Sequence, residues 1–470
     1  MELDVLGLMA ACSYALDCVE AELVHVTDKH AKRVAYMSVC MAEQMGIQGK
    51  MLQDLTVCAL LHDNALTQYI QEELQGMDDR QHDSQGESYE EDLKDCRSEK
   101  YDVVQDKRMA ERQNEGQNDG LNESLDNSQN KNLNVGSVGN GNGNDISGKS
   151  LPQLGIHCAL GEKNIRKLPF HTDVKNVILY HHENADGSGP FGKKWNEVPL
   201  FARIIHFCDL LDRDYGSKEF TENTWKRVKD FIAEINGSIV DEECIEGFIA
   251  AFTEEHFLSL GQKDLEKKLW SRVPRETQEL DFSQIKDLAE FFARIVDYKS
   301  PFTSTHSIGV AETAEKMARF MGFDEETAQK MYLAGALHDI GKVAIGNEIL
   351  EKPGRLTDDE FAIMKHHAAY TYYILSEIDN FDEMRDWAAF HHEHLDGSGY
   401  PFGKTGEELN TQERIMACAD IYQALTESRP YKKGMSHEKA CGILEDMGSR
   451  GWLDMDVIRN VEECFGEANK

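Results

Sequence analysis

The stretch His391-His-Glu-His-Leu-Asp-Gly-Ser-Gly-Tyr-Pro401 has a close counterpart earlier in the chain, His181-His-Glu-Asn-Ala-Asp-Gly-Ser-Gly-Pro190. Both stretches begin with two adjacent histidines and run into a glycine-rich loop. The earlier copy is one residue shorter, at the position of Tyr400. A pattern that occurs twice along a chain indicates an internal repeat, so we expect two related structural units.

Seven residues of metal-binding type recur in register around these stretches. In the C-terminal half they are His306, His338, Asp339, His367, His391, His392 and Asp420. In the N-terminal half they are His30, His62, Asp63, His157, His181, His182 and Asp209. Equivalent residues differ in number by 276 for the first three pairs, 210 for the next three and 211 for the last. Chance does not preserve such a register, so the sequence predicts a duplicated metal site.

The N-terminal copy contains an insertion. The drop in offset from 276 to 210 places 66 additional residues between Asp63 and His157. Residues 72–150 hold 19 Asp/Glu against 9 Lys/Arg and include the run Gly136-Ser-Val-Gly-Asn-Gly-Asn-Gly-Asn144. Such a composition buries too little apolar surface to offset the entropy of ordering, so we predict a disordered acidic insertion in a loop.

Elsewhere the apolar residues follow helical spacing, as in Ile308, Ala311, Ala314 and Ala318 after His306. No convincing strand periodicity occurs, so we predict an all-α fold. We divide the chain into an N-terminal unit at residues 1–220, a helical connector at 221–285 and a C-terminal unit at 286–470.

Composition narrows the classes of partner. The formal charge of −35 argues against binding DNA or RNA polymers and against acidic membrane surfaces. Eleven cysteines without a CxxC pair are typical of reduced thiols in a cytosol. The beginning Met-Glu-Leu-Asp does not resemble a signal peptide, and no apolar run is long enough to cross a membrane. We therefore expect a cytoplasmic protein without membrane insertion.

The ligand set indicates more than one metal ion. Five imidazoles and two carboxylates exceed the needs of one tetrahedral zinc and suit two six-coordinate ions of the Fe or Mn kind. In the adjacent pair of His338 and Asp339, the carboxylate can bridge two ions while each ion takes its own histidines. Paired metals lower the pKa of a shared water and hold both oxygens of a phosphoryl displacement. The sequence thus favours phosphoryl chemistry.

The C-terminal half resembles the HD-GYP family of the HD phosphohydrolase superfamily. The resemblance covers roughly residues 286–448 and is carried by His338-Asp-Ile-Gly-Lys342 and by the stretch that ends Gly-Tyr-Pro401. Further matching pieces are Glu351-Lys-Pro-Gly-Arg-Leu-Thr357, Ala419-Asp-Ile-Tyr-Gln-Ala-Leu-Thr426 and Arg429-Pro-Tyr-Lys432. The family is all-helical, so the resemblance implies two HD-type helical bundles in tandem. It also implies a metal-dependent phosphodiesterase that hydrolyses a cyclic dinucleotide, usually cyclic di-GMP, to linear pGpG, GMP or both.

The resemblance also implies roles for individual residues. One metal would take His306, His338, Asp339 and Asp420, and the other would share Asp339 and add His367, His391 and His392. Asp339 and Lys342 would act in catalysis, with Lys342 contacting the scissile phosphate. Further substrate contacts would come from Gly397, Gly399, Tyr400, Arg429 and Lys432. Family members with a third metal carry a Glu where this chain has Phe302, so we predict two ions, Fe or Mn, in the C-terminal site. Ala368 stands where the family has a proline.

The N-terminal copy keeps all seven ligand types but has Leu66 in place of Lys342. It could bind metal in a regulatory role, form a second active site, or be structural. For the whole protein, the rival substrate is 3′,3′-cyclic GMP-AMP, and mononucleotides or alarmones are more distant rivals. A non-catalytic scaffold that binds a cyclic dinucleotide is the alternative outside the enzymes. A homodimer or a signalling partner is also consistent with the apolar stripes of the connector.

Overall fold

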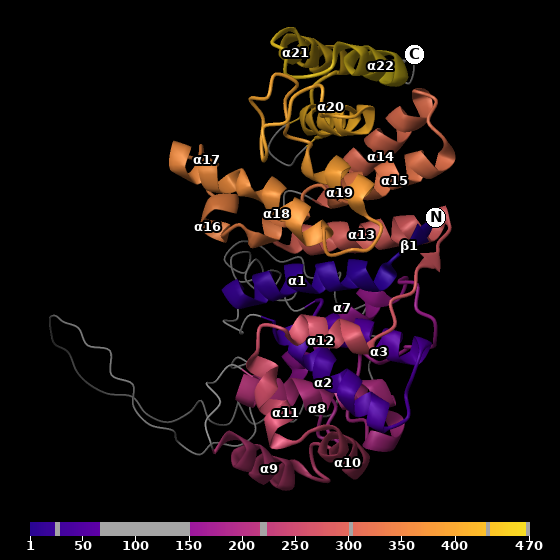
Figure 1. The fold of residues 1–470 in the computed structure, drawn as a ribbon, viewed down its shortest axis with the longest axis vertical. Coiled ribbons are helices and arrows are strands. Elements are labelled where there is room, and N and C mark those ends of the chain that lie inside the picture. The colour runs from indigo at the N-terminus through magenta and orange to yellow at the C-terminus, as the bar shows by residue number, and fades with distance from the viewer. Residues whose placement is uncertain (24–28, 66–150, 217–222, 300–303, 429–432, 467–470) are drawn as a thin grey trace, which may run out of the picture.

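The computed structural model describes residues 1–23, 29–65, 151–216, 223–299, 304–428 and 433–466 (Figure 1). The predicted insertion at residues 72–150 lies outside these ranges, as do Leu66, Phe302, Arg429 and Lys432. The described chain consists of helices and loops, with a short antiparallel pair of β1 (Glu2–Leu3) and β2 (Gln278–Glu279). The prediction of an all-α fold is confirmed. No helix among these residues is both long and apolar enough to cross a bilayer.

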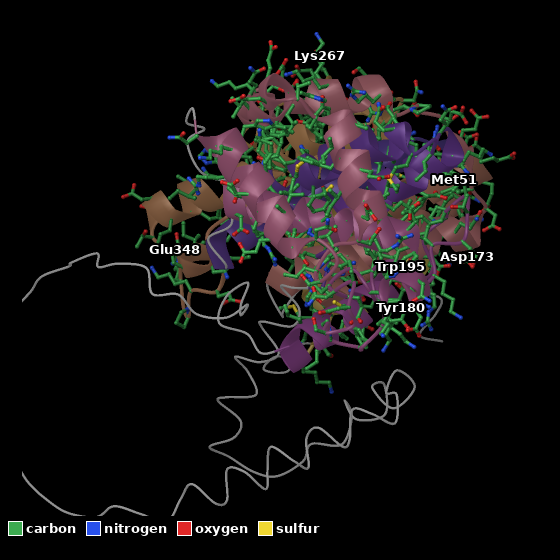
Figure 2. All side chains as sticks on the ribbon, turned by 90° about the horizontal axis from the view of Figure 1, so that it is seen from below. Met51, Asp173, Tyr180, Trp195, Lys267 and Glu348 are labelled. Carbon is green, nitrogen blue, oxygen red and sulfur yellow. The ribbon has the colours of Figure 1, made fainter. Side chains whose placement is uncertain are left out.

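The N-terminal half is a bundle around one central helix. It contains α1 (Val5–Leu23), α2 (His30–Gln44), α3 (Lys50–Leu60), α7 (Leu151–Ile165), the 3-10 turn η1 (Trp195–Glu197), α8 (Leu200–Leu211) and the π-helical turn η2 (Asp212–Gly216). α2 is buried along most of its length because α3 and α8 pack against it. Met51 and Trp195, labelled in Figure 2, belong to this half and are half-exposed.

The predicted connector packs onto the N-terminal bundle. It forms α9 (Thr224–Ile235), α10 (Glu242–Ala251), α11 (Glu254–Leu258), η3 (Ser259–Gly261) and α12 (Leu265–Arg272). α10 and α12 both contact α2, and the rings of Phe207 and Phe248 join α8 to α10 with centroids 5.3 Å apart. The apolar stripes of this segment are therefore used within the chain. The domain bounds themselves stay a prediction.

The C-terminal half repeats the arrangement of the site helices. It contains α13 (Phe282–Lys299), α14 (Ser304–Phe320), α15 (Glu325–Leu337), η4 (Ile340–Ala344), α16 (Asn347–Leu350), α17 (Asp358–Met364), α18 (His366–Leu375), α19 (Asp382–Ala389), α20 (Thr411–Thr426), α21 (His437–Ser449) and α22 (Met455–Gly466). α14 packs on α15 and α20, as α2 packs on α3 and α8. The register of the ligands makes α14, α15, α18 and α20 the counterparts of α2, α3, α7 and α8.

Side-chain caps fix the beginnings of two helices of the C-terminal centre, α15 and α20. The carboxylate of Asp324 accepts the backbone N–H of Thr327 at 2.8 Å at the start of α15. At the start of α20, Asn410 and Glu413 accept each other's backbone N–H groups in a capping box. Each cap supplies partners for N–H groups that the first helical turn leaves open.

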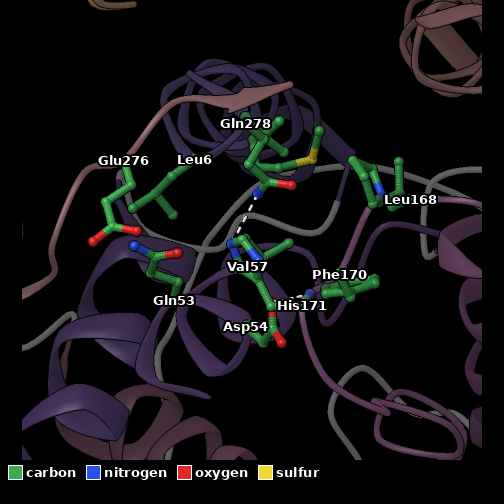
Figure 3. A pocket seen from close by; sticks show the side chains of 12 residues that line it. Leu6, Gln53, Asp54, Val57, Leu168, Phe170, His171, Glu276 and Gln278 are labelled. Atoms are coloured by element: carbon green, nitrogen blue, oxygen red, sulfur yellow. Dashed lines mark hydrogen bonds between the residues drawn. The ribbon is translucent and has the colours of Figure 1, made fainter. Parts of the chain in front are cut away.

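The two halves meet along α1 and α13, which lie side by side across the middle of the molecule (Figure 1). Their buried residues, such as Leu8 and Leu288, belong to one continuous apolar core. On the N-terminal side of this seam, the ring of His171 is hydrogen-bonded to Gln278 at 3.0 Å (Figure 3). The cavity beside that bond is only about 10 Å³, which is too small for a ligand, so this pocket is part of the packing.

Candidate metal centres

The seven predicted ligands of the C-terminal half come together from five parts of the chain. His306 lies in α14, His338 ends α15, and Asp339 follows directly. The remaining ligands come from α18, from the turn after α19 and from α20, and they are His367, His391, His392 and Asp420. All are buried except His392, which is partly exposed. The chain thus folds so that residues spread over more than a hundred positions face one centre.

Asp339 occupies the middle of this group. Its Oδ2 lies 3.2 Å from Nε2 of His338, and its Oδ1 lies 3.6 Å from Nε2 of His367. His338 belongs with His306, whereas His367 belongs with His391 and His392, as two separate groups of possible ligands. The carboxylate therefore turns one oxygen to each group, which is the arrangement that a bridging ligand requires.

Asp420 completes the first group. Its Oδ1 lies 3.1 Å from Nε2 of His306 and 3.8 Å from Nε2 of His338. Nδ1 of His306 lies 3.6 Å from Oε2 of Glu427, one of the last residues before the gap at 429–432. At this distance the carboxylate of Glu427 is near the ring but is not hydrogen-bonded to it.

Three of the other four histidines are oriented by backbone carbonyls. Nδ1 of His338 lies 2.6 Å from the carbonyl oxygen of Gly335. Nδ1 of His367 lies 2.7 Å from the carbonyl oxygen of Met364, and Nδ1 of His391 lies 2.7 Å from that of Ala388. The Nε2 atoms of these three histidines are buried and have no hydrogen-bond partner. Buried polar atoms without a partner are costly, and metal coordination would satisfy them. The donor set thus fits divalent metal ions.

The protonation states also suit metal binding. Burial alone would raise the pKa of Asp339, but His338 and Lys342 hold that pKa well below its usual range. Burial lowers the pKa of His392 to about 3, and burial beside His392 lowers that of His391 well below its ordinary value. The carboxylate is therefore ionised and these two rings are neutral at pH 7, as metal ligands must be.

A cleft of about 370 Å³ opens beside the second group. Its walls include His391, His392 and Tyr400, whose ring lies 4.7 Å from that of His392. Phe361 of α17 and Lys365, which caps the end of this helix, also line the cleft. Lys342 lies at the centre itself, where its ammonium group donates a hydrogen bond to Asp339. Two aromatic faces and a lysine thus border the candidate metal centre.

The Gly-Ser-Gly-Tyr-Pro loop is held by a residue that we did not single out from the sequence. Glu393 accepts backbone N–H groups of Phe402, Gly403 and Lys404 at 2.7, 3.1 and 2.9 Å. A Cβ at Gly399 would lie 2.3 Å from the backbone nitrogen of His394, so only glycine allows this close packing. Gly397 has a φ of 77° in the same loop. The repeat could have revealed Glu393, because Glu183 stands at its position.

Other site residues had no sequence signal. Thr371 donates to the carbonyl oxygen of His338 at 2.9 Å and accepts the N–H of Gly341 at 3.0 Å. Phe361 and Lys365 reach the cleft only because α17 packs beside the loop. Arg429 and Lys432, predicted to contact substrate, lie outside the described residues.

The N-terminal ligands form a similar centre. Oδ2 of Asp63 lies 3.5 Å from Nε2 of His62, while Oδ1 lies 3.3 Å from Nε2 of His157 and 3.5 Å from that of His181. Asp209 lies between the two remaining histidines, His30 and His182. Its Oδ1 lies 3.5 Å from Nε2 of His30, and its Oδ2 lies 3.9 Å from Nδ1 of His182. The bridging arrangement of the carboxylate is therefore present in both halves.

The surroundings of the N-terminal centre differ. Nδ1 of His30 lies 2.7 Å from Asp212, whose carboxylate also accepts two hydrogen bonds from Arg33. The C-terminal half has Gly309 and Gln423 at the positions of Arg33 and Asp212, with the Gln423 side chain filling the space beside the glycine. A second difference is Cys158, whose Sγ lies 3.8 Å from Nε2 of His157. Burial would raise the pKa of this thiol, but the adjacent His157 and His181 lower it to about 7.

Comparisons with known proteins agree with this geometry. A family model described as an HD domain matches residues 142–227 and 290–457. Two 3′3′-cGAMP-specific phosphodiesterases of Vibrio cholerae, numbers 1 and 3, are 31% and 32% identical to the chain. The matches cover 66% and 65% of this chain and 74% and 65% of those proteins. The cyclic di-GMP phosphodiesterase response regulator RpfG of Xanthomonas campestris is 39% identical over 32% of this chain and 41% of its own length.

A solved structure of a cyclic GMP-AMP specific phosphodiesterase of V. cholerae has the same fold. It covers 99% of this chain and 98% of its own, with a TM-score of 0.60 and 23% identity. Helical bundles in tandem, each built around an HD pair, define the class of protein. The chain belongs to the HD-GYP family of the HD phosphohydrolase superfamily.

Proposed function

We propose that the protein is a metal-dependent phosphodiesterase whose C-terminal half hydrolyses a cyclic dinucleotide, with cyclic di-GMP as the first candidate substrate. The observation that carries this proposal is the carboxylate of Asp339. It turns one oxygen to each of two histidine groups and accepts a hydrogen bond from Lys342, and His391 and His392 of the second group line a cleft of about 370 Å³. Cyclic dinucleotide phosphodiesterases are also the relatives that the chain matches.

Two divalent ions, Fe or Mn, would occupy the C-terminal centre. His306, His338 and Asp420 would hold one, His367, His391 and His392 the other, and Asp339 both. Bound there, paired metals supply an activated water and a clamp on the oxygens of the scissile phosphate. The donor set contains only imidazole nitrogens and carboxylate oxygens, which suit ions of this kind.

The protein's own groups would bind and orient the substrate. Lys342 is an ammonium donor at the centre, so it would stabilise the negative charge that develops on the phosphate in the transition state. Phe361 and Tyr400 present aromatic faces to the cleft, where nucleobases can stack. Gly397 and Gly399 allow the loop to pack closely behind Tyr400 and so fix its ring beside His392. Hydrolysis would yield linear pGpG, GMP or both.

The second candidate substrate is 3′,3′-cyclic GMP-AMP. One specific observation favours it, because the relatives that match about two thirds of this chain carry that substrate in their names. The relatives named for cyclic di-GMP match between 32% and 40% of the chain. We therefore expect the N-terminal half to influence which nucleobase the site accepts. That influence would distinguish 3′,3′-cyclic GMP-AMP from cyclic di-GMP as the substrate. The homodimer or signalling partner expected from the sequence stays a prediction.

Product analysis tests the proposal. Full-length protein loaded anaerobically with Mn or Fe is given both cyclic dinucleotides in one reaction, and linear and mononucleotide products are separated by chromatography. We expect turnover in the wild type and none in Asp339→Asn, whose neutral amide is a poor bridge. If both substrates stay intact while metal is bound, the proposed phosphodiesterase activity is rejected. Tight nucleotide binding without product would instead support the scaffold alternative.

A further inference from the structure

The two metal centres differ at one position inside the second ligand group. The residue after the mid-domain histidine is Cys158 in the N-terminal half and Ala368 in the C-terminal half. As a result, the N-terminal group has four possible ligands, which are His157, Cys158, His181 and His182, whereas its counterpart has only His367, His391 and His392. The thiol is therefore an addition to the repeated pattern.

The geometry places the thiol among the imidazoles. His157 and Cys158 are neighbours in α7, and the four ligand atoms of the group lie within 4.8 Å of one another. Sγ lies 3.8 Å from Nε2 of His157, and ligands of one tetrahedral zinc ion lie about 3.3–3.8 Å apart. Cys158 is fully buried, and the Nε2 atoms of His181 and His182 are buried without a hydrogen-bond partner. Three donors and a thiol thus share one enclosed space.

We propose that Cys158 is a fourth ligand of this N-terminal ion and that the site therefore binds zinc in preference to the iron or manganese expected in the C-terminal half. A thiolate is a soft ligand that selects zinc over ions preferring oxygen. On binding, the thiol proton leaves to solvent and the sulfur donates a lone pair to the metal. Three imidazoles and one thiolate complete a tetrahedral coordination sphere, as in closed zinc sites. In this arrangement Asp63 would serve the other ion, in the group that it forms with His30 and His62.

A closed sphere has a consequence for function. Catalytic zinc keeps one position open for water, and the thiolate takes that position here. A cavity at the equivalent place in the N-terminal half, lined by Glu183, Asn184 and Trp195 among others, measures only about 10 Å³. The C-terminal cleft, lined by the equivalent Glu393 and His394, measures about 370 Å³. Of the three roles open to the N-terminal copy, this inference favours a structural or regulatory metal site over a second active site. It does not rest on the activity of the C-terminal half.

Cobalt spectroscopy on the full chain tests the ligand directly. Metal-free protein is titrated with Co²⁺, because a cobalt–thiolate bond gives a charge-transfer band in the near ultraviolet. We expect this band in the wild type and in Cys58→Ala, which removes another buried thiol of the same half. The band should be lost in Cys158→Ala. Zinc affinity, measured by competition with a chelator, should fall about tenfold or more when one of four ligands is removed.

Cys158→Ser keeps the size of the side chain and guards against misfolding of the alanine variant. Far-ultraviolet circular dichroism and nucleotide turnover by the C-terminal half should stay unchanged in both variants. Three outcomes would each overturn the inference. Cobalt could bind to the wild type without a sulfur band, it could fail to bind at the N-terminal group, or the band could persist in Cys158→Ala. These outcomes are independent of the phosphodiesterase assay, so either proposal can fail alone.

Discussion

Lys342 donates a hydrogen bond to Oδ2 of Asp339, the same carboxylate oxygen that lies 3.2 Å from His338. The lysine follows the aspartate by one turn, in η4, so the chain itself sets their separation. In the proposed function, this fixed cation beside the Asp339 carboxylate would contact the scissile phosphate. The N-terminal sequence has Leu66 at this position.

Replacing this cation tests its role. Lys342→Leu, which copies the N-terminal residue, should lower kcat about 10²–10³-fold, because a preorganised donor to the transition state is lost. Metal content by elemental analysis should change little, since the lysine is not a ligand. Lys330→Leu is the control variant, because it removes a lysine on the outer side of α15 in the same half. We expect it to leave turnover unchanged. If the variant loses metal together with activity, Lys342 acts by holding the metal ligands in place and not by stabilising the transition state.

The two bridging aspartates should behave differently. Asp339→Asn should abolish turnover and lower the metal content of the C-terminal half. Asp63→Asn should leave most of the turnover intact, because the N-terminal centre lacks both the lysine and the Tyr400 equivalent. Parallel assays of product and bound metal measure both effects. Equal loss of turnover in the two variants would mean that both halves act in catalysis.

Phe361 should contribute to substrate binding. Stacking of a base on an aromatic ring is worth about 1–3 kcal/mol, so Phe361→Ala should raise KM about 5- to 100-fold while kcat changes little. Tyr373→Ala is the matched control, because Tyr373 is an exposed aromatic residue of α18 outside the cleft. Steady-state kinetics with both cyclic dinucleotides measures the effect. An unchanged KM for each substrate would exclude a contact at this position.

Gly341 permits a close approach between two site segments. A Cβ there would lie 2.0 Å from the carbonyl oxygen of His367 and 2.5 Å from the backbone nitrogen of Thr371. Gly341→Ala should therefore destabilise the protein by about 1–3 kcal/mol and lower metal content, because η4 and α18 must separate. Gly442→Ala in α21, where a Cβ meets nothing within 4 Å, should be neutral or stabilising. Denaturant unfolding measures both variants.

Protonation of His392 should make the metal-free protein sensitive to acid. Burial lowers its pKa to about 3, whereas an unfolded histidine has a pKa of about 6.5. Above pH 6.5 both states are neutral, so the folded state suffers no penalty. As the pH falls below 6.5, the unfolded state binds the proton first, and stability falls by about 1.4 kcal/mol per pH unit until pH 3.

The unfolding free energy of wild type and His392→Gln should be compared between pH 7.5 and 4.5 in the presence of a chelator. We expect a shallower pH dependence in the variant, since this histidine no longer contributes. Parallel curves would mean that the folded state leaves the pKa of His392 at its unfolded value.

The sequence determined the all-α class, the duplication and the seven candidate ligands of each half. Helical spacing and the offsets of 276, 210 and 211 depend only on the order of residues, so they can be read before folding. The His-Asp pair is informative for the same reason, because adjacent residues stay adjacent in space. The bridging position of Asp339 could therefore be expected, and the structure places its oxygens accordingly.

Only the tertiary structure decided which further groups reach the centres. Phe361 and Lys365 line the cleft because α17 packs beside a loop about 30 residues later in the chain. The sequence showed Ala368 as a departure from the family but gave no reason to notice Cys158 at the same place. Its thiol becomes a candidate ligand because α7 turns both Cys158 and His157 toward His181. Contacts between distant segments depend on packing, which local spacing does not specify.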